Sequence, residues 1–354
     1  MKFVSRPRYS KGSTHRIISP EETCRRVAPH MRKIGVTRVA DTTGLDILGM
    51  PIYSAIRPTD AGLDGISVYN GKGLTKADSH AGAMMEAIER YRAETWLGAT
   101  YEGTYPEILD RTDLESVSVM DPAAMRLQQR LSYDHEMALR WCDGWDLFKD
   151  RPALIPLNFV LCPYDGPGED VWISSSNGLA SGNCIEEAVC HALAELIERD
   201  AYTTAIVRAQ IAPRFEHAMQ RLLSGDQVPE PSVDDSIYPS IDLESVPAPV
   251  SRLVRSAQRS GLEVWLRDMT SDVGIPSFVG SMRGWDDDGD EFPAGGFGCD
   301  PNATIAAIRA ITEAAQGRNV RIQGAREDAS AVKAKSSQAE RVLWWLCQVD
   351  LAPP

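Results

Sequence analysis

The chain has 354 residues, enough to bury a stable hydrophobic core without disulfide bonds or structural metals. Its formal net charge of -13 argues against a nucleic-acid partner, since phosphate backbones are bound by basic patches. No apolar run approaches the roughly 18 residues of a membrane-spanning helix, and residues 1–20 are polar and basic, so we expect a cytoplasmic protein without membrane contact. The seven cysteines form no C-x-x-C pair, which favours free thiols over a zinc or redox site.

The first third of the chain predicts short strands that lead into a long helix. Ser19 and Pro20 are typical of an N-cap and a first helical residue, and this helix should run to about Lys33. Alternating apolar residues then predict strands, and small residues ahead of an unbroken stretch predict a turn and a helix. The predicted strands span 36–40, 51–57 and 65–71, the turn spans 71–73, and the helix spans about 75–97.

The same plan recurs twice. The second unit has predicted strands at 141–145, 153–158 and 171–175, a turn at 178–182 and a helix at about 184–208. The third has predicted strands at 263–267 and 275–282, a turn at 295–298 and a helix at about 304–318. These repeated strand-turn-long-helix units predict an α+β fold, with a single domain over residues 1–354.

Two segments fall outside the repeats. Residues 224–250 are rich in Pro, Ser and Asp and are predicted to be a surface insertion. Residues 338–349 predict a C-terminal helix that carries Trp344 and Trp345. Buried tryptophans belong to a core or an interface, so a homodimer is one alternative.

Glutamates and arginines recur with one spacing on the long helices. The motif Glu-x-x-Glu-Arg occurs at residues 86–90 and again at residues 195–199, at the same place within each unit. The third helix places Arg309 and Glu313 one turn apart, with Arg318 on the opposite face. One such cluster is typical of a solvated helix face, whereas repetition on three helices favours a shared site.

If the three helices converge, at least four carboxylates face one another, which raises their pKa values unless cations occupy the site. Oxygen ligands in this number suit Mg²⁺, which commonly bridges carboxylates to nucleotide phosphates. Arg90, Arg199 and Arg309 would then offset phosphate charge through bidentate hydrogen bonds, and Asn183 would add an amide ligand. The pattern therefore predicts a nucleotide together with a metal. His80 and His191 lie on the same helices and are expected to be ordinary packed or surface residues.

Taken in order, these motifs resemble the YcaO family over roughly residues 19–322. The motifs are Gly71-Lys72-Gly73, Ser79, residues 86–90, residues 176–183, Glu186-Glu187-Ala188, residues 195–200, Asp300-Pro301, Arg309, Glu313 and residues 316–318.

The resemblance implies a YcaO-type ATP-binding fold and an enzyme that phosphorylates the oxygen of a peptide-backbone amide with ATP and Mg²⁺. It assigns nucleotide contacts to Lys72, Ser79, Glu86, Asn183, Glu187 and Arg309, and magnesium ligation to Glu86, Glu89, Glu195 and Glu198. It assigns catalysis to Arg90, Glu187, Arg199, Arg309 and Glu313. Such a cage suits phosphoryl transfer, in which catalysis is mostly positioning and charge neutralisation.

The resemblance leaves the product open between two chemistries. A Cys, Ser or Thr side chain of the substrate would close an azoline ring, whereas sulfide would give a thioamide. The chain ends in Ala352-Pro353-Pro354, at most a fragment of the P-x-P-x-P tail of azoline-forming members, and it has no obvious fused peptide-recognition domain. We therefore expect a stand-alone enzyme that makes thioamides on a ribosomally made peptide or protein, together with a TfuA-like partner.

Two hypotheses of other classes remain. One is a non-catalytic module that binds nucleotide or peptide and presents a substrate to a partner. The other is a carboxylate-metal hydrolase that works without nucleotide.

Overall fold

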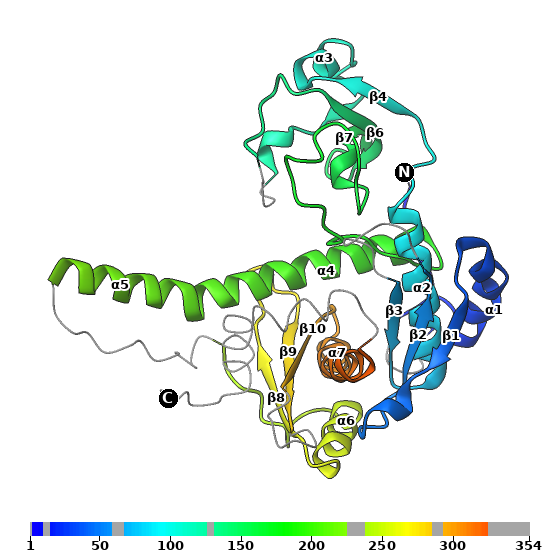
Figure 1. Ribbon diagram of the computed structural model, residues 1–354, viewed down its shortest axis with the longest axis vertical. Helices are drawn as coiled ribbons and strands as arrows, with labels where there is room; N and C mark the ends of the chain where they lie inside the picture. The colour runs from blue at the N-terminus through cyan, green and yellow to red at the C-terminus, as the bar shows by residue number, and fades with distance from the viewer. Residues whose placement is uncertain are drawn as a thin grey trace.

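The computed structural model describes residues 2–9, 15–58, 67–125, 131–224, 238–284 and 293–324. Its body contains two three-stranded antiparallel sheets (Figure 1). The first sheet consists of β1 (Arg38–Asp41), β2 (Ile52–Ile56) and β3 (Val68–Lys72), in that order. Helix α2 (Lys76–Ala93) packs on this sheet and α1 (Pro20–Met31) packs on α2. Helix α1 begins at the predicted cap, because the Ser19 side chain accepts from the Glu22 N–H, and α2 begins at about the predicted residue, where Thr75 forms a capping box with Asp78.

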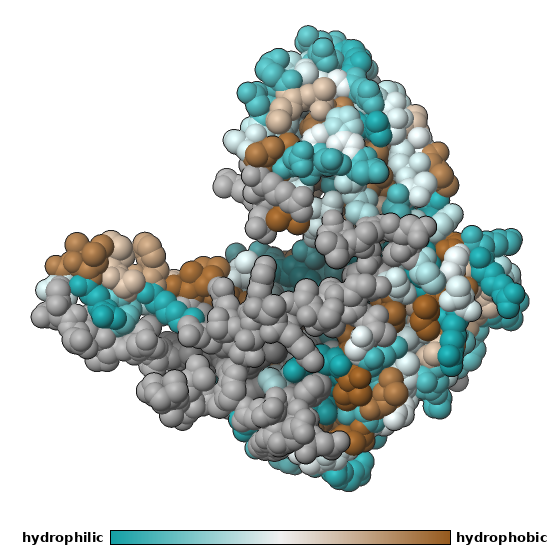
Figure 2. Space-filling model, viewed as in Figure 1, coloured by the Kyte–Doolittle hydropathy of each residue, from teal (hydrophilic) through white to brown (hydrophobic). Residues whose placement is uncertain are grey.

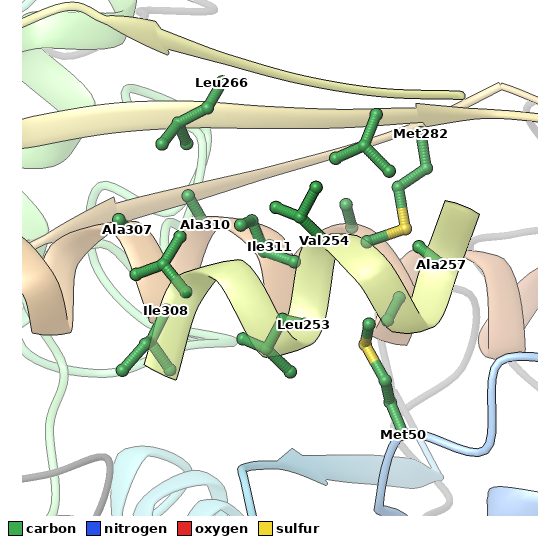
Figure 3. Packing of buried hydrophobic residues seen from close by; sticks show 14 of the residues in the cluster. Met50, Leu253, Val254, Ala257, Leu266, Met282, Ala307, Ile308, Ala310 and Ile311 are labelled. Atoms are coloured by element: carbon green, nitrogen blue, oxygen red, sulfur yellow. The ribbon is translucent and has the colours of Figure 1, made fainter. Parts of the chain in front are cut away.

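The second sheet has the order β10-β9-β8 and is covered on both faces. Its strands are β8 (Glu263–Asp268), β9 (Ser277–Arg283) and β10 (Ala294–Cys299). Helices α6 (Ala248–Arg259) and α7 (Ala303–Gln323) cover one face, and Figure 3 shows Leu253 and Ile311 from these helices packed with Met282 of β9. Helix α4 (Ile185–Ile206) covers the other face, since its buried alanines contact Val279. The alternation of Phe278 and Val279 between the two faces is the period-two pattern of a strand.

A four-stranded sheet forms a lobe above the body in Figure 1. Its order is β4-β6-β7-β5, and β5 alone pairs in parallel. The strands are β4 (Thr100–Gly103), β5 (Ser118–Val119), β6 (Leu139–Asp146) and β7 (Arg151–Pro156), with helix α3 (Tyr105–Asp110) beside them. Trp141, Leu139 and Trp172 fill the core of this lobe. Short 3-10 turns elsewhere span Arg32–Ile34, Thr43–Leu45, Pro122–Ala124 and Leu157–Phe159.

One continuous helical rod extends from the body. Helix α4 leads through a π-helical turn at Val207–Ile211 into α5 (Ala212–Ser224), and Figure 1 shows this ribbon projecting past the second sheet. Among the described residues, no helix is long and apolar enough to cross a membrane.

Helix α7 lies between the two three-stranded sheets and joins them (Figure 1). Its Gln316 Nε2 donates to the Asn70 carbonyl of β3 at 2.8 Å, and its Asn319 Nδ2 donates to the Thr42 carbonyl at 2.8 Å. Arg318 pairs with buried Asp46 at 3.1 Å, in the same segment as Thr42. Arg309 and Glu313 instead contact His191 and Lys72, so Arg318 lies on a different side of α7 from these two residues, as predicted.

Glycines allow the helix backbones to touch the sheets. A β-carbon on Gly71 of β3 would overlap the backbone of Ser79 and Ala83 in α2. A β-carbon on Gly296 of β10 would overlap the backbone of α7 in the same way. The predicted turns at 71–73 and 295–298 are therefore wrong in large part, because residues 71–72 and 294–299 are strand residues whose glycines serve close packing.

Three other predictions are wrong, only partly correct, or fall on residues outside the described ranges. Residues 171–175 form no strand, although Val171 and Trp172 are buried in the lobe core. The predicted insertion at 224–250 ends in core structure, because α6 begins at Ala248 and Val250 is fully buried. Residues 225–237 and the predicted C-terminal helix at 338–349 lie outside the described residues, and a single domain over 1–354 remains a prediction.

The first and third units follow the predicted plan, with strands that lead directly into α2 and α7. In the second unit, residues 157–184 separate β7 from α4. The predicted turn at 178–182 lies in this connection and Gly178 has a positive φ of 83°, as glycine-dependent turns do. The architecture is thus mixed α and β.

Candidate active site

Three carboxylates from α2 and α4 accept hydrogen bonds from backbone N–H groups of neighbouring segments. Glu86 accepts from the N–H of Asn70 in β3 at 3.1 Å. Glu89 accepts from the N–H of Ser181 at 3.0 Å, and Glu195 accepts from the N–H of Gly178 at 3.1 Å. The connection at 178–183 therefore binds a glutamate from each helix and brings the two Glu-x-x-Glu-Arg motifs together.

The carboxylates of this group repel one another. Burial, together with the negative charges of Glu86 and Glu195, raises the pKa of Glu89 to about 7. A carboxyl group with such a pKa is half protonated at neutral pH, and a cation beside it would restore its charge. The raised pKa that the sequence predicted for converging carboxylates is confirmed at Glu89.

A second group combines α4, α7 and β3. Lys72 Nζ forms an ion pair with Glu313, and Glu198 lies beside them with only 3% of its surface exposed. Burial and the Glu313 charge raise the pKa of Glu198 to about 7. Burial would also raise the pKa of Glu313, but the positive charges of Lys72, Arg199 and Arg309 outweigh burial and lower it.

Arg199 links the two carboxylate groups. Its Nη2 lies 3.8 Å from Glu195 Oε1 and 3.7 Å from Glu198 Oε1. The buried Nε atoms of Arg90, Arg199 and Arg309 have no hydrogen-bond partner among the described residues. Buried donors of this kind are normally satisfied, so three unsatisfied guanidinium N–H groups fit a site that receives an anion.

Arg309 is held by a histidine. Its Nη2 lies 3.0 Å from His191 Nε2, and a guanidinium can only donate, so this ring nitrogen accepts. Burial and the Arg309 charge lower the pKa of His191 to about 2, which keeps the ring neutral. Sequence reasoning expected His191 to be an ordinary packed or surface residue, yet His191 positions the predicted site residue Arg309.

The N-terminal segment closes one side of the site. Arg16 Nη1 lies 3.1 Å from Glu187 Oε1, and Asn183 Nδ2 donates to the same carboxylate oxygen at 3.2 Å. The signal that would have found Arg16 is the excess of basic residues before residue 17 in an acidic chain. A cavity of about 310 Å³ separates this segment from α4 and α7. Its charged and polar lining consists of Ser5, Arg6, Arg8, His15, Arg16, Cys184, Glu186, Glu187, Cys190, His191, Asp300 and Arg309.

Ser79 stands apart from the other predicted site residues. Its side chain is fully buried, and its hydroxyl donates to the Gly71 carbonyl at 3.0 Å. The hydroxyl thus joins α2 to β3 at the point where Gly71 permits close packing. A nucleotide contact for Ser79 stays a prediction.

The donor set fits a magnesium-bound nucleotide by its chemistry. Within the described part of the chain, no three His, Cys, Asp or Glu side chains already converge in a metal-binding arrangement, because the glutamates are turned to backbone N–H groups. Burial, followed by neighbouring carboxylates, raises the pKa values of Glu89 and Glu198. A divalent cation beside them would stabilise their charged forms, and the unsatisfied arginine N–H groups would bind phosphate oxygens.

Comparison with known proteins identifies the family. Residues 70–346 match the family model described as YcaO cyclodehydratase, ATP- and Mg²⁺-binding. The chain belongs to the YcaO family. ATP and Mg²⁺ are therefore its cofactors, and the family is one of ATP-dependent enzymes that modify the peptide backbone.

Relatives of this YcaO chain come from archaea and bacteria. An uncharacterized protein of Methanothermobacter thermautotrophicus is 35% identical over 317 residues, which cover 88% of this chain and 72% of that protein. A protein of Rhizobium leguminosarum bv. trifolii, located in the tfuA 3' region, is 32% identical and covers 89% of this chain and 69% of that protein.

Solved structures show the same fold. A heterocyclase in complex with substrate and cofactor superposes with a TM-score of 0.70 at 24% identity, and the match covers 99% of this chain but 45% of the heterocyclase. The YcaO of Methanopyrus kandleri bound with AMPPCP and Mg²⁺ gives a TM-score of 0.60 at 24% identity, over 89% of this chain and 71% of that one. This YcaO chain thus spans less than half of the heterocyclase.

Proposed function

We propose that this YcaO protein uses ATP to activate a peptide-backbone amide and converts the amide to a thioamide with sulfide. The observation that carries the proposal is the meeting of buried and half-buried glutamates and arginines from α2, α4 and α7 beside a cavity that Arg16 and Arg309 line. The relative in the tfuA 3' region supports the TfuA-associated type, and so a TfuA-like partner.

The nucleotide phosphates would lie where Arg309 borders both the cavity and the carboxylates. Arg309 and Glu187 line the cavity, and Lys72 pairs with Glu313, which lies one helical turn from Arg309 on α7. Asn183, already bonded to Glu187, would turn its amide to the nucleotide. Glu86, Glu89, Glu195 and Glu198 would hold Mg²⁺.

ATP supplies the phosphoryl group that turns the amide oxygen into a leaving group, while Mg²⁺ offsets the negative charge. The balanced reaction takes amide, ATP and hydrosulfide to thioamide, ADP and hydrogen phosphate, and the hydrosulfide proton leaves on the phosphate. Arg90, Arg199 and Arg309 would stabilise the charge that develops on the transferring group through N–H groups that are already desolvated. Glu187 would keep Arg16 and Asn183 in place through the contacts described above.

Ring formation is the second candidate, since the matched family model is that of a cyclodehydratase. There the nucleophile would be a Cys, Ser or Thr side chain of the substrate, and one water would be lost per ring. The same activated amide serves both reactions, so the residues of this chain would have the same roles.

The decisive experiment combines the protein with ATP, Mg²⁺, sulfide, a TfuA-like protein and a peptide encoded beside its gene. Mass spectrometry of the peptide should show exchange of one oxygen for one sulfur, with one phosphate released per exchange. Arg309→Lys should abolish both signals because it loses the bidentate fork, whereas the exposed α6 control Arg252→Lys should retain them.

Each alternative has its own result. Loss of one water from the peptide would establish ring formation instead. Neither a mass change nor phosphate release would indicate a non-catalytic scaffold. Hydrolysis that needs metal but no ATP would indicate a carboxylate-metal hydrolase.

A further inference from the structure

Helix α5 leaves the body of the molecule without burying a described side chain. The rod is anchored up to Ala209, because Ala201, Ala205 and Ala209 are buried against the second sheet. Beyond that point α5 contains no buried residue. Most helical stability in proteins comes from packing of an apolar face, so this helix gains stability when another surface covers it.

The outer side of this rod is apolar. The α5 stripe consists of Ile211, Phe215, Met219, Leu222 and Leu223, all exposed, with Phe215 at 65%, Leu222 at 78% and Leu223 at 80%. At 100° per residue these five side chains fall within an arc of about 120°, which is the width of a helix face that packs against a partner. Figure 2 shows brown residues collected along the projecting end where α5 lies. A contiguous exposed apolar surface of this kind marks an interaction site.

One edge of the stripe is basic. Arg214 and Arg221 are seven residues apart, so they lie above one another beside Ile211 and Leu222. Both are exposed, and neither forms an ion pair within the described part of the chain. Glu216 projects from the far side, beyond Leu223.

We propose that the α5 stripe docks an acidic amphipathic helix of a partner protein. The apolar face of that helix would cover the stripe, and its carboxylates would pair with Arg214 and Arg221. Antiparallel pairing of two α5 helices would bring the Arg214–Arg221 edges together, so that arrangement of a second copy is disfavoured. Charge complementarity therefore favours an acidic helix over an antiparallel second α5.

The position of the stripe gives docking a direct connection to the active site. Helix α4 carries Glu195, Glu198 and Arg199, and α5 continues it through the π-helical turn at Val207–Ile211. A partner held on α5 would thus be attached to the helix that provides half of the carboxylates.

The test uses two synthetic helical peptides with identical leucine faces, one flanked by glutamates and the other by lysines. Fluorescence anisotropy with the full chain at low salt should show binding of the glutamate peptide, with the lysine peptide about tenfold weaker, as two exposed ion pairs would give. The double variant Arg214→Glu/Arg221→Glu should reverse this preference. Phe215→Ser/Leu222→Ser should abolish binding of both peptides.

All four substituted side chains are exposed, so the variants should keep the wild-type circular dichroism spectrum. The readout needs no ATP, so it is independent of the proposed reaction. Equal binding of the two peptides, or binding of neither, would overturn the proposal. Binding only after deletion of residues 325–354 would mean that this chain's own end covers the stripe. Wild-type dimers that Phe215→Ser/Leu222→Ser converts to monomers would mean that a second copy does.

Discussion

Replacing Glu198 by glutamine should stabilise the metal-free protein, and increasingly so at high pH. Glu198 is almost fully buried, and burial with the Glu313 charge raises its pKa from the ordinary 4.5 to about 7. A folded-state pKa above the unfolded one means that stability is complete below the unfolded pKa and is lost as pH rises through the folded pKa. Glutamine has the shape of the neutral carboxyl group and does not ionise, so Glu198→Gln escapes this loss.

The size of the effect follows from the two pKa values. Each pKa unit corresponds to about 1.4 kcal/mol, so complete ionisation of Glu198 costs the folded state up to about 3 kcal/mol. Between about pH 5.5 and pH 8.5, the advantage of Glu198→Gln should grow by about 2 kcal/mol.

The assay is urea unfolding followed by tryptophan fluorescence, with chelator present and nucleotide absent. The exposed control Glu244→Gln removes one carboxylate from the same acidic chain and should show no comparable pH-dependent gain. A Glu198→Gln protein that is less stable than the wild type at both pH values would refute the reasoning. The same substitution should weaken Mg²⁺-ATP binding, so the Glu198 carboxylate contributes to function at a cost in folding stability.

Three further predictions follow from the site and its surroundings. Mg²⁺-ATP should bind more tightly at pH 8 than at pH 6 and should release protons, because Glu89 is half protonated near pH 7. Calorimetry in buffers of different ionisation enthalpy measures this proton release, and finding none would contradict the prediction. Lys72→Met and Glu313→Gln should each lower the free energy of unfolding. The double variant should lose about 0.5–3 kcal/mol less than the sum of the two single losses, and strictly additive losses in urea unfolding would exclude the ion pair. Arg318→Met should cost about 3–5 kcal/mol because it leaves Asp46 charged and buried, while ATP affinity per folded molecule stays the same; a large loss of ATP affinity would place Arg318 in the site instead.

The sequence predicts the long helices well, because their signals are local. Ser19 and Thr75 are side-chain caps, and an unbroken helical stretch follows each. The Glu-x-x-Glu-Arg motifs at 86–90 and 195–199 repeat, which distinguishes them from ordinary solvated faces. The resemblance to the YcaO family then adds what spacing alone does not give, namely the nucleotide and the reaction.

The wrong predictions concern residue types that are common in two kinds of local structure. Gly296 was expected in a turn, yet it is a strand residue that lets a helix approach. Residues 171–175 were expected to form a strand, yet Trp172 makes only a single β-bridge and is buried in the lobe core. Helix α6 was missed because Pro247 and Pro249 resemble an irregular segment, although proline is well tolerated in the first turn of a helix.

The contacts of Arg16 and His191 lay beyond sequence reasoning for another reason. Arg16 pairs with Glu187 across 171 residues, and His191 meets Arg309 across 118. No local pattern encodes a contact of that separation. Both became visible only when the fold placed the N-terminal segment and α7 beside α4.

The contact between β10 and α7 bears on how substitution data for this protein should be interpreted. A methyl group at Gly296 would push α7 outward, and Arg309 and Glu313 would move with it. A saturation screen scored by activity would then rank this glycine beside the charged residues, although it has no chemistry of its own. Proteolytic susceptibility measured without nucleotide would separate the two kinds of position, because a displaced helix loosens the apo protein while a missing guanidinium leaves it intact.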